Sequence, residues 1–145
     1  MCFDWLFNKQ IPRSSSSVVI VRPASKTWVN GLAQTYSELY DEDRLGGYIE
    51  QREYEQIMER INDMLINYFP CPLSWWCGYI CCLFTLGLSL LCPYICISDA
   101  EEQVDQLIRR INSKKLKQKQ MKLVLRKKCM TSWLEWHLPT ETEMR

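Results

Sequence analysis

The stretch from Cys71 to Ser98 reads CPLSWWCGYICCLFTLGLSLLCPYICIS. It carries no charged side chain and holds six of the chain's eight cysteines. The uncharged run is longer still, because it begins after Asp63 and ends before Asp99. Such a composition is typical of a metal site, a disulfide framework, a buried core helix or a membrane segment. The choice among these four decides the fold and most of the function.

The cysteine spacing does not favour a zinc site. Structural zinc is held by four nitrogen or sulfur ligands, usually in two close pairs, but the stretch has no Cys-x-x-Cys motif and the only histidine, His137, is distant. A disulfide framework is disfavoured because the first residues, MCFDWLFNKQ, lack the apolar core of a signal peptide. A catalytic thiol needs a nearby base, which this stretch does not offer. We therefore predict no metal, no cofactor and no catalytic residue.

Membrane contact is favoured over a buried core helix. The stretch is apolar all round, and a chain of 145 residues has little core in which to surround such a helix. The run from Leu73 to Leu91 is about as long as a spanning helix requires. Gly78, Gly87 and Pro93 allow it to bend, so a spanning helix and an interfacial or re-entrant hairpin both stay open.

The flanks of the stretch carry ordinary secondary-structure patterns. Val18–Val21 is β-branched and predicts a strand, and Lys26 to Tyr36 predicts a second strand with a bend at Gly31. Ile49 to Tyr68 has apolar residues at spacings of three and four, which predicts an amphipathic helix. The acidic segment between these patterns, up to residue 47, predicts a loop.

Beyond the stretch, Asp99 to Lys119 predicts a second amphipathic helix, for which Ser98 and Asp99 suit the start. Two short strands follow at Met121–Leu125 and Trp133–Leu138, separated by a basic turn at 126–129.

Together these patterns predict an α+β fold. It contains a small antiparallel sheet from N- and C-terminal strands, two amphipathic helices, and one apolar membrane-associated helix or re-entrant hairpin. We predict a single domain over residues 17–139, with the apolar segment at 71–98. Residues 1–16 are predicted to be a flexible N-terminal segment and 140–145 a tail.

The charges are unevenly distributed although the net charge is only +1. Between residues 109 and 128 every charged side chain is Lys or Arg, which favours contact with an anionic membrane surface. Nucleic acid is disfavoured, since the block lacks interleaved aromatic residues and a recognised binding module. The predicted membrane-facing residues are Arg109, Arg110, Lys114, Lys115, Lys117 and Lys119.

Several parts of the stretch resemble the signature of the cysteine-rich hydrophobic domain (CHIC) family. They are SWWCGYICC at 74–82, TLG at 85–87 and PYICIS at 93–98. The flanks from about residue 17 to 139 resemble the strands and first helix of the same family. That family belongs with golgin subfamily A member 7 and the accessory subunit of the yeast Ras palmitoyltransferase.

The resemblance implies a palmitoylated, membrane-associated α+β domain on the Golgi, cytoplasmic vesicles or the plasma membrane. It also implies a non-catalytic role beside a DHHC-type protein acyltransferase. Relatives carry a denser cysteine run, where this chain has Leu83, Phe84 and Leu88. The lipidation sites that the resemblance implies are Cys77, Cys81, Cys82, Cys92 and Cys96.

The sequence therefore favours a non-enzymatic, palmitoylated trafficking adaptor that associates with membrane lipids at their cytosolic face. One alternative is an accessory regulatory subunit of a DHHC-type palmitoyltransferase. Another is a soluble zinc-binding module.

Overall fold

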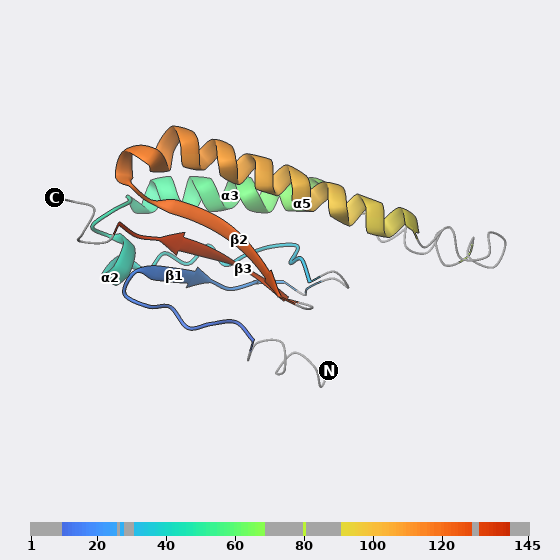
Figure 1. The fold of residues 1–145 in the computed structure, drawn as a ribbon, viewed down its shortest axis with the longest axis horizontal. Coiled ribbons are helices and arrows are strands. Elements are labelled where there is room, and N and C mark those ends of the chain that lie inside the picture. Colours follow the sequence, from blue (N-terminus) through green and yellow to red (C-terminus); the bar gives the residue numbers. More distant parts are fainter. Residues whose placement is uncertain are drawn as a thin grey trace.

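The computed structural model describes residues 10–25, 27, 31–68, 80, 91–128 and 131–139, and for residues 91–97 it describes the backbone alone. In these residues a three-stranded antiparallel sheet is covered on one face by two long helices (Figure 1). The predicted α+β class and the antiparallel sheet of N- and C-terminal strands are therefore confirmed. A short third helix lies at one end of the sheet.

The last of the described strands lies at the centre of the sheet. The strands are β1 (Val18–Val21), β2 (Lys122–Lys128) and β3 (Thr131–His137), in the order β1-β3-β2. Trp136 is opposite Val19 on one side and Leu123 on the other. Because side chains alternate between the faces of a strand, these residues form a buried face toward the helices. That face consists of Val19, Val21, Leu123, Leu134 and Trp136.

The first long helix, α3, covers residues Gln51–Tyr68. Its buried side chains recur every three or four residues and pack on the sheet, so the predicted amphipathic helix is confirmed with a start two residues later. These side chains are Tyr54, Ile57, Met58, Ile61, Asn62 and Leu65.

The second long helix, α5, runs from Leu91 to Ile111. Its start lies eight residues before Asp99, so the predicted start at Ser98 and Asp99 is wrong. Pro93 is the third residue of the helix, where a backbone N–H has no helical partner to lose. The side chains buried against α3 and the sheet are Ala100, Val104, Ile108 and Ile111.

The helical path continues from α5 to Lys119, as predicted, but with a changed geometry. Asn112–Leu116 form a π-helical turn, η2, and Lys117–Lys119 a 3₁₀ turn, η3. Gln120 then adopts a left-handed conformation with φ 52°, which reverses the chain into β2.

The predicted basic turn at 126–129 is wrong for the residues described. Arg126–Lys128 extend β2 and pair with Thr131–Trp133 of β3. The connection itself, residues 129–130, lies outside the described residues.

The predicted strand from Lys26 to Tyr36 is absent from the described part of that segment. Two isolated bridges, Pro23 with Tyr36 and Thr27 with Ala33, take its place. Side chains rather than a neighbouring strand accept the N–H groups of Ala33 and Tyr36. Gly31 has φ 87° and makes the predicted bend. The acidic segment predicted as a loop contains a one-turn helix, α2 (Glu42–Leu45).

Candidate membrane-attachment site

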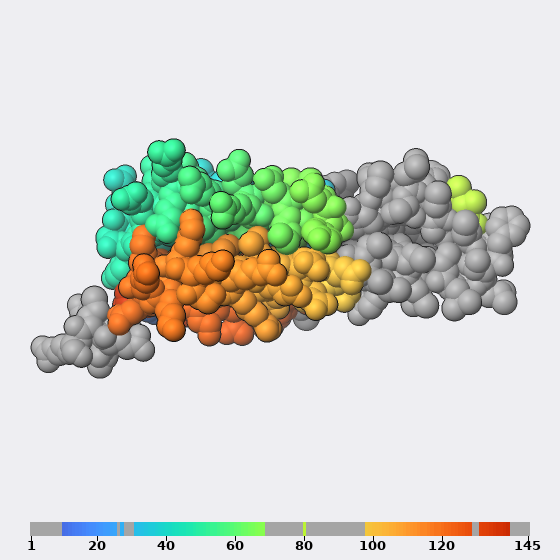
Figure 2. Space-filling model, turned by 90° about the horizontal axis from the view of Figure 1, so that it is seen from above, coloured from blue at the N-terminus to red at the C-terminus, as the bar shows by residue number. Residues whose placement is uncertain are grey.

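Helices α3 and α5 run antiparallel and side by side, so the chain leaves and re-enters the helical layer at the same end (Figures 1 and 2). α3 ends there at Tyr68 and α5 begins there at Leu91. Two large apolar side chains near the end of α3, Ile66 and Tyr68, are 49% and 47% exposed. In the part of the chain that the structure describes, no helix combines the length and apolar character needed to cross a membrane.

The five predicted lipidation sites fall into two groups. Cys92 and Cys96 lie in the first two turns of α5, four residues and therefore about one helical turn apart. Cys77, Cys81 and Cys82 lie outside the described residues.

An acidic band follows the uncharged start of α5. It consists of Asp99, Glu101, Glu102 and Asp105. Glu101 forms an ion pair with Lys127 of β2, with 2.5 Å between Nζ and a carboxylate oxygen. Asp99 and Glu102 are exposed. Negative charge therefore separates the cysteine-bearing end of α5 from its basic end.

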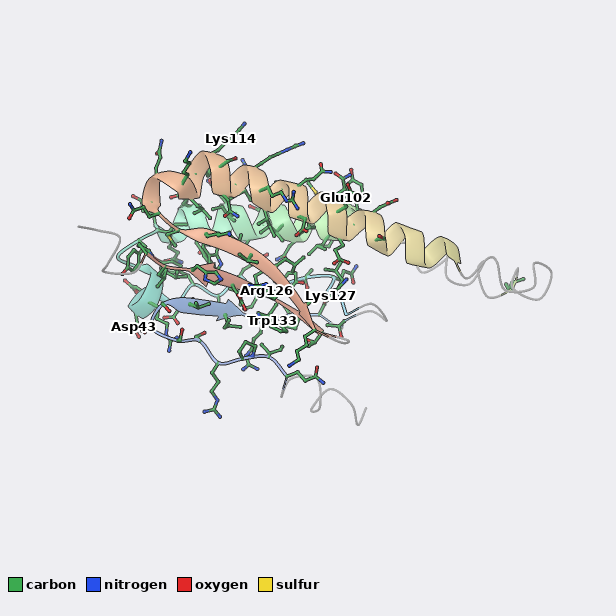
Figure 3. All side chains as sticks on the ribbon, in the orientation of Figure 1. Asp43, Glu102, Lys114, Arg126, Lys127 and Trp133 are labelled. Atoms are coloured by element: carbon green, nitrogen blue, oxygen red, sulfur yellow. The ribbon has the colours of Figure 1, made fainter. Side chains whose placement is uncertain are left out.

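The six predicted basic residues gather at the far end of the helical layer. Arg109, Arg110, Lys114 and Lys117 are exposed, and Lys114 points away from the sheet (Figure 3). Lys119 instead contacts Glu53 at the start of α3, at 2.5 Å. This ion pair joins the end of η3 to α3, so the charge of Lys119 is already paired with an acidic residue of the domain.

The side-chain amide of Asn112 positions the lysine-bearing turn. Its Nδ2 donates to the carbonyl of Leu123 at 2.8 Å, and its Oδ1 accepts from the N–H of Leu123 at 2.8 Å. The amide thus satisfies both outward backbone groups of Leu123 in β2, as a neighbouring strand would. No local sequence signal marks Asn112, because its partner lies eleven residues away across the turn.

The cysteine end and the basic end of α5 are well separated. From Cys92 to Arg110 the helix rises about 27 Å, whereas electrostatic attraction in physiological salt is screened over roughly 8–10 Å. The structure therefore does not gather Cys92 and Cys96 with the basic residues at one point. A flat membrane meets both sets only when α5 lies along its surface.

A buried polar cluster fixes residues 31–38 between α3 and β3. The Oδ1 of Asn62 accepts from the N–H of Tyr36 at 2.8 Å, and its Nδ2 donates to the Tyr36 carbonyl at 3.0 Å and to Glu38 at 2.7 Å. Ser132 contacts the Tyr36 hydroxyl at 2.7 Å and accepts from the N–H of Ala33. Burial raises the pKa of Tyr36, although the hydrogen bond to Ser132 opposes it. The sequence interpretation missed this cluster, whose only signal is an amide within the apolar stripe of α3.

A second polar cluster lies on the sheet face turned away from the helices. Glu135 accepts from the indole N–H of Trp133 at 2.8 Å, from Arg126 at 3.3 Å, and contacts His137 at 3.1 Å. Burial tends to raise the pKa of Glu135, but these hydrogen bonds and the charge of Arg126 outweigh it and hold the pKa below its ordinary value. His137, the only histidine, is thus paired with this carboxylate. Within the described residues, no three or more His, Cys, Asp or Glu side chains are grouped as metal ligands.

A known protein family matches most of the chain. The model of the Golgin subfamily A member 7/ERF4 family matches residues 5–133, which include both long helices, the apolar segment and most of the sheet. The chain belongs to the Golgin subfamily A member 7/ERF4 family. The Golgin A7/ERF4 relationship inferred from the cysteine-rich motifs is confirmed, while the closer resemblance to the CHIC proteins stays a prediction. No solved structure matches this Golgin A7/ERF4 family member.

Proposed function

We propose that this Golgin A7/ERF4 family member is a non-catalytic, membrane-associated protein that supports a DHHC-type protein S-palmitoyltransferase. The single observation that supports it is the antiparallel pair of helices α3 and α5 in a chain of this family. α3 ends and α5 begins at the same end of a packed domain, and the uncharged, cysteine-rich sequence connects these two points. Such a segment suits contact with lipid or with the membrane helices of an enzyme partner.

The chain would itself carry acyl chains on cysteines of this segment. One acyl chain gives only marginal membrane binding, whereas two give stable attachment. Cys92 and Cys96 lie about one turn apart in a helix that continues into the packed domain. Acylation at both would therefore couple lipid attachment to the domain through a rigid element.

The basic residues at the far end of α5 are proposed to add attraction to anionic lipid. Each well-placed Lys or Arg contributes about 1 kcal/mol at such a surface. Because about 27 Å separates Cys92 from Arg110, this contribution requires α5 to lie along the membrane. Residence on Golgi, vesicle or plasma membranes, and a role as trafficking adaptor, belong to the same proposal and rest on the family resemblance.

The proposal is tested by expressing a DHHC-type enzyme with and without this chain and measuring the enzyme's recovery and acyl transfer. We expect both to rise with the chain present and the two proteins to purify together. The Cys92→Ser/Cys96→Ser variant should lower membrane attachment, while Cys129→Ser, outside the uncharged stretch, serves as the matched control. Unchanged enzyme recovery and activity without the chain would refute the accessory role.

A further inference from the structure

Strand β2 forms an edge of the sheet, and its outward backbone groups are only partly used. Asn112 bonds to the N–H and C=O of Leu123, so these two groups point away from β3. In an antiparallel strand the direction of the backbone groups alternates from residue to residue. The N–H and C=O groups of Val124 and Arg126 therefore point toward β3, whereas those of Leu125 and Lys127 point toward the outer edge.

These outer groups are open in the structure. Among the residues that it describes, no hydrogen bond reaches the outward N–H or C=O of Leu125 or Lys127. The opposite edge of the sheet differs, because Ser15 and Ser14 side chains accept the outward N–H groups of Val18 and Ile20 at 3.2 and 2.9 Å. An open strand edge is a template for a further strand.

A groove of about 480 Å³ lies between the hairpin end of β2 and α5. Its charged lining is Glu101, Glu102, Asp105, Arg109 and Lys127. Lys127 neutralises Glu101, while Glu102 and Asp105 form no ion pair within the described part of the chain. Figure 3 shows Glu102 on α5 and Lys127 near the end of β2. Arg109 is the second basic residue of the lining, so three acidic side chains face two basic ones and the groove keeps a net negative charge, which favours a basic side chain on the helix-covered side of the edge.

The other side of the same edge has the opposite charge. Lys122, Arg126 and Lys128 are exposed and alternate with the helix-facing residues of β2. Arg126 also forms an ion pair with Glu135, with 3.3 Å between its Nε and a carboxylate oxygen. A strand added beside β2 would thus meet acidic groups on one face and basic groups on the other.

We propose that the edge from Leu125 to Lys127 binds an extended segment of a partner polypeptide whose side chains alternate between basic and acidic. The main chain of this segment bonds to Leu125 and Lys127. Its basic side chains enter the groove beside Glu102 and Asp105, and its acidic side chains lie beside the basic face. The inference does not rest on the proposed accessory role. A second copy of β2 fits poorly because all its charged residues are basic.

The test uses the full chain in detergent micelles and two fluorescent octapeptides of identical composition. One alternates Lys and Glu, and the other carries four Lys followed by four Glu. Only the alternating peptide separates the two charges onto opposite faces of a strand. We expect it to bind about tenfold more tightly than the block peptide, as fluorescence anisotropy would show. Equal affinities, or no binding of the alternating peptide, would overturn the proposal.

Variants locate the site. Glu102→Lys/Asp105→Lys reverses the groove and should weaken binding of the alternating peptide about tenfold. The matched control, Glu55→Lys/Glu59→Lys, makes the same change in net charge on exposed positions of α3 and should leave binding unchanged. Equal losses in the two variants would show attraction by net charge alone and would contradict the proposal.

Amide hydrogen exchange reports the backbone pairing itself. In the free chain we expect slow exchange at Val124 and Arg126, which bond to β3, and fast exchange at Leu125 and Lys127. The alternating peptide should slow exchange at Leu125 and Lys127 selectively. Protection of other residues alone contradicts edge pairing, as does a stable dimer, detected by sedimentation, that already protects Leu125 and Lys127 without peptide.

Discussion

Replacing Asn62 with alanine should destabilise the domain by removing three hydrogen bonds from its interior. Asn62 is 5% exposed, and its amide satisfies both backbone groups of Tyr36, a residue that is 1% exposed. Alanine at this position leaves a buried N–H and a buried C=O without partners. At about 1–3 kcal/mol for each buried unsatisfied group, the expected loss is about 2–6 kcal/mol. This is a large part of the roughly 5–15 kcal/mol that stabilises a typical domain.

Urea unfolding of the full chain in micelles, followed by tryptophan fluorescence, measures this loss. The matched control is Asn67→Ala, because Asn67 lies on the same helix but is exposed, and its expected effect is within about 0.5 kcal/mol. If Asn62→Ala is no more destabilising than Asn67→Ala, the polar cluster does not hold residues 31–38 in place and the reasoning is refuted.

Three further predictions concern the polar cluster on the outer face of the sheet and the turns that follow α5. Because the folded-state pKa of Glu135 lies below its ordinary value, its stabilisation is present above the ordinary carboxyl range and is lost as pH falls through the folded-state pKa. Glu135→Gln should therefore flatten the acid-side decline of the unfolding free energy, and an unaltered decline contradicts this. Asn112→Ala should destabilise the domain by about 1–3 kcal/mol, because it removes two part-buried hydrogen bonds to Leu123, whereas the adjacent exposed Ser113→Ala should have little effect in the same urea experiment. Lys114→Glu/Lys117→Glu should weaken binding to anionic vesicles by at least about 2 kcal/mol and leave binding to neutral vesicles unchanged in flotation assays; equal effects on both vesicles would oppose α5 lying along the membrane.

The sequence patterns that rest on local periodicity or composition predicted their elements well. Tyr54, Ile57, Ile61 and Leu65 recur at helical spacing, and each is buried in α3 as expected. The β-branched run at Val18–Val21 forms the predicted strand. Both signals can be read from a few neighbouring residues, because the first is the helical period and the second is β-branched composition.

Elements set by distant partners were not predictable in the same way. Lys26 to Tyr36 has strand character, but Ser132 and Asn62 bind its backbone, and both lie far away in sequence. Arg126–Lys128 has the composition of a turn, yet pairing with β3 extends the strand through it. Pro93 predicts a helix end in isolation, whereas its position in the first turn of α5 makes it compatible with a helix start.

The site shows the same division. Local composition predicted lipidation in the uncharged segment and membrane contact by the basic residues from Arg109 to Lys119, and both stay predictions. It did not reveal that Lys119 pairs with Glu53, because 66 residues separate them. It also did not reveal that the length of α5 separates Cys92 and Cys96 from the basic residues.

If the proposed function is right, the cysteine-rich segment is acylated and holds the domain at a membrane. The most direct measurement is the intact mass of the full chain from the membrane fraction, before and after hydroxylamine treatment. Mass increments matching one or more palmitoyl groups, which hydroxylamine removes and which decrease in Cys92→Ser/Cys96→Ser, are the predicted result. An unmodified mass, with the chain recovered in the soluble fraction, would contradict the claim.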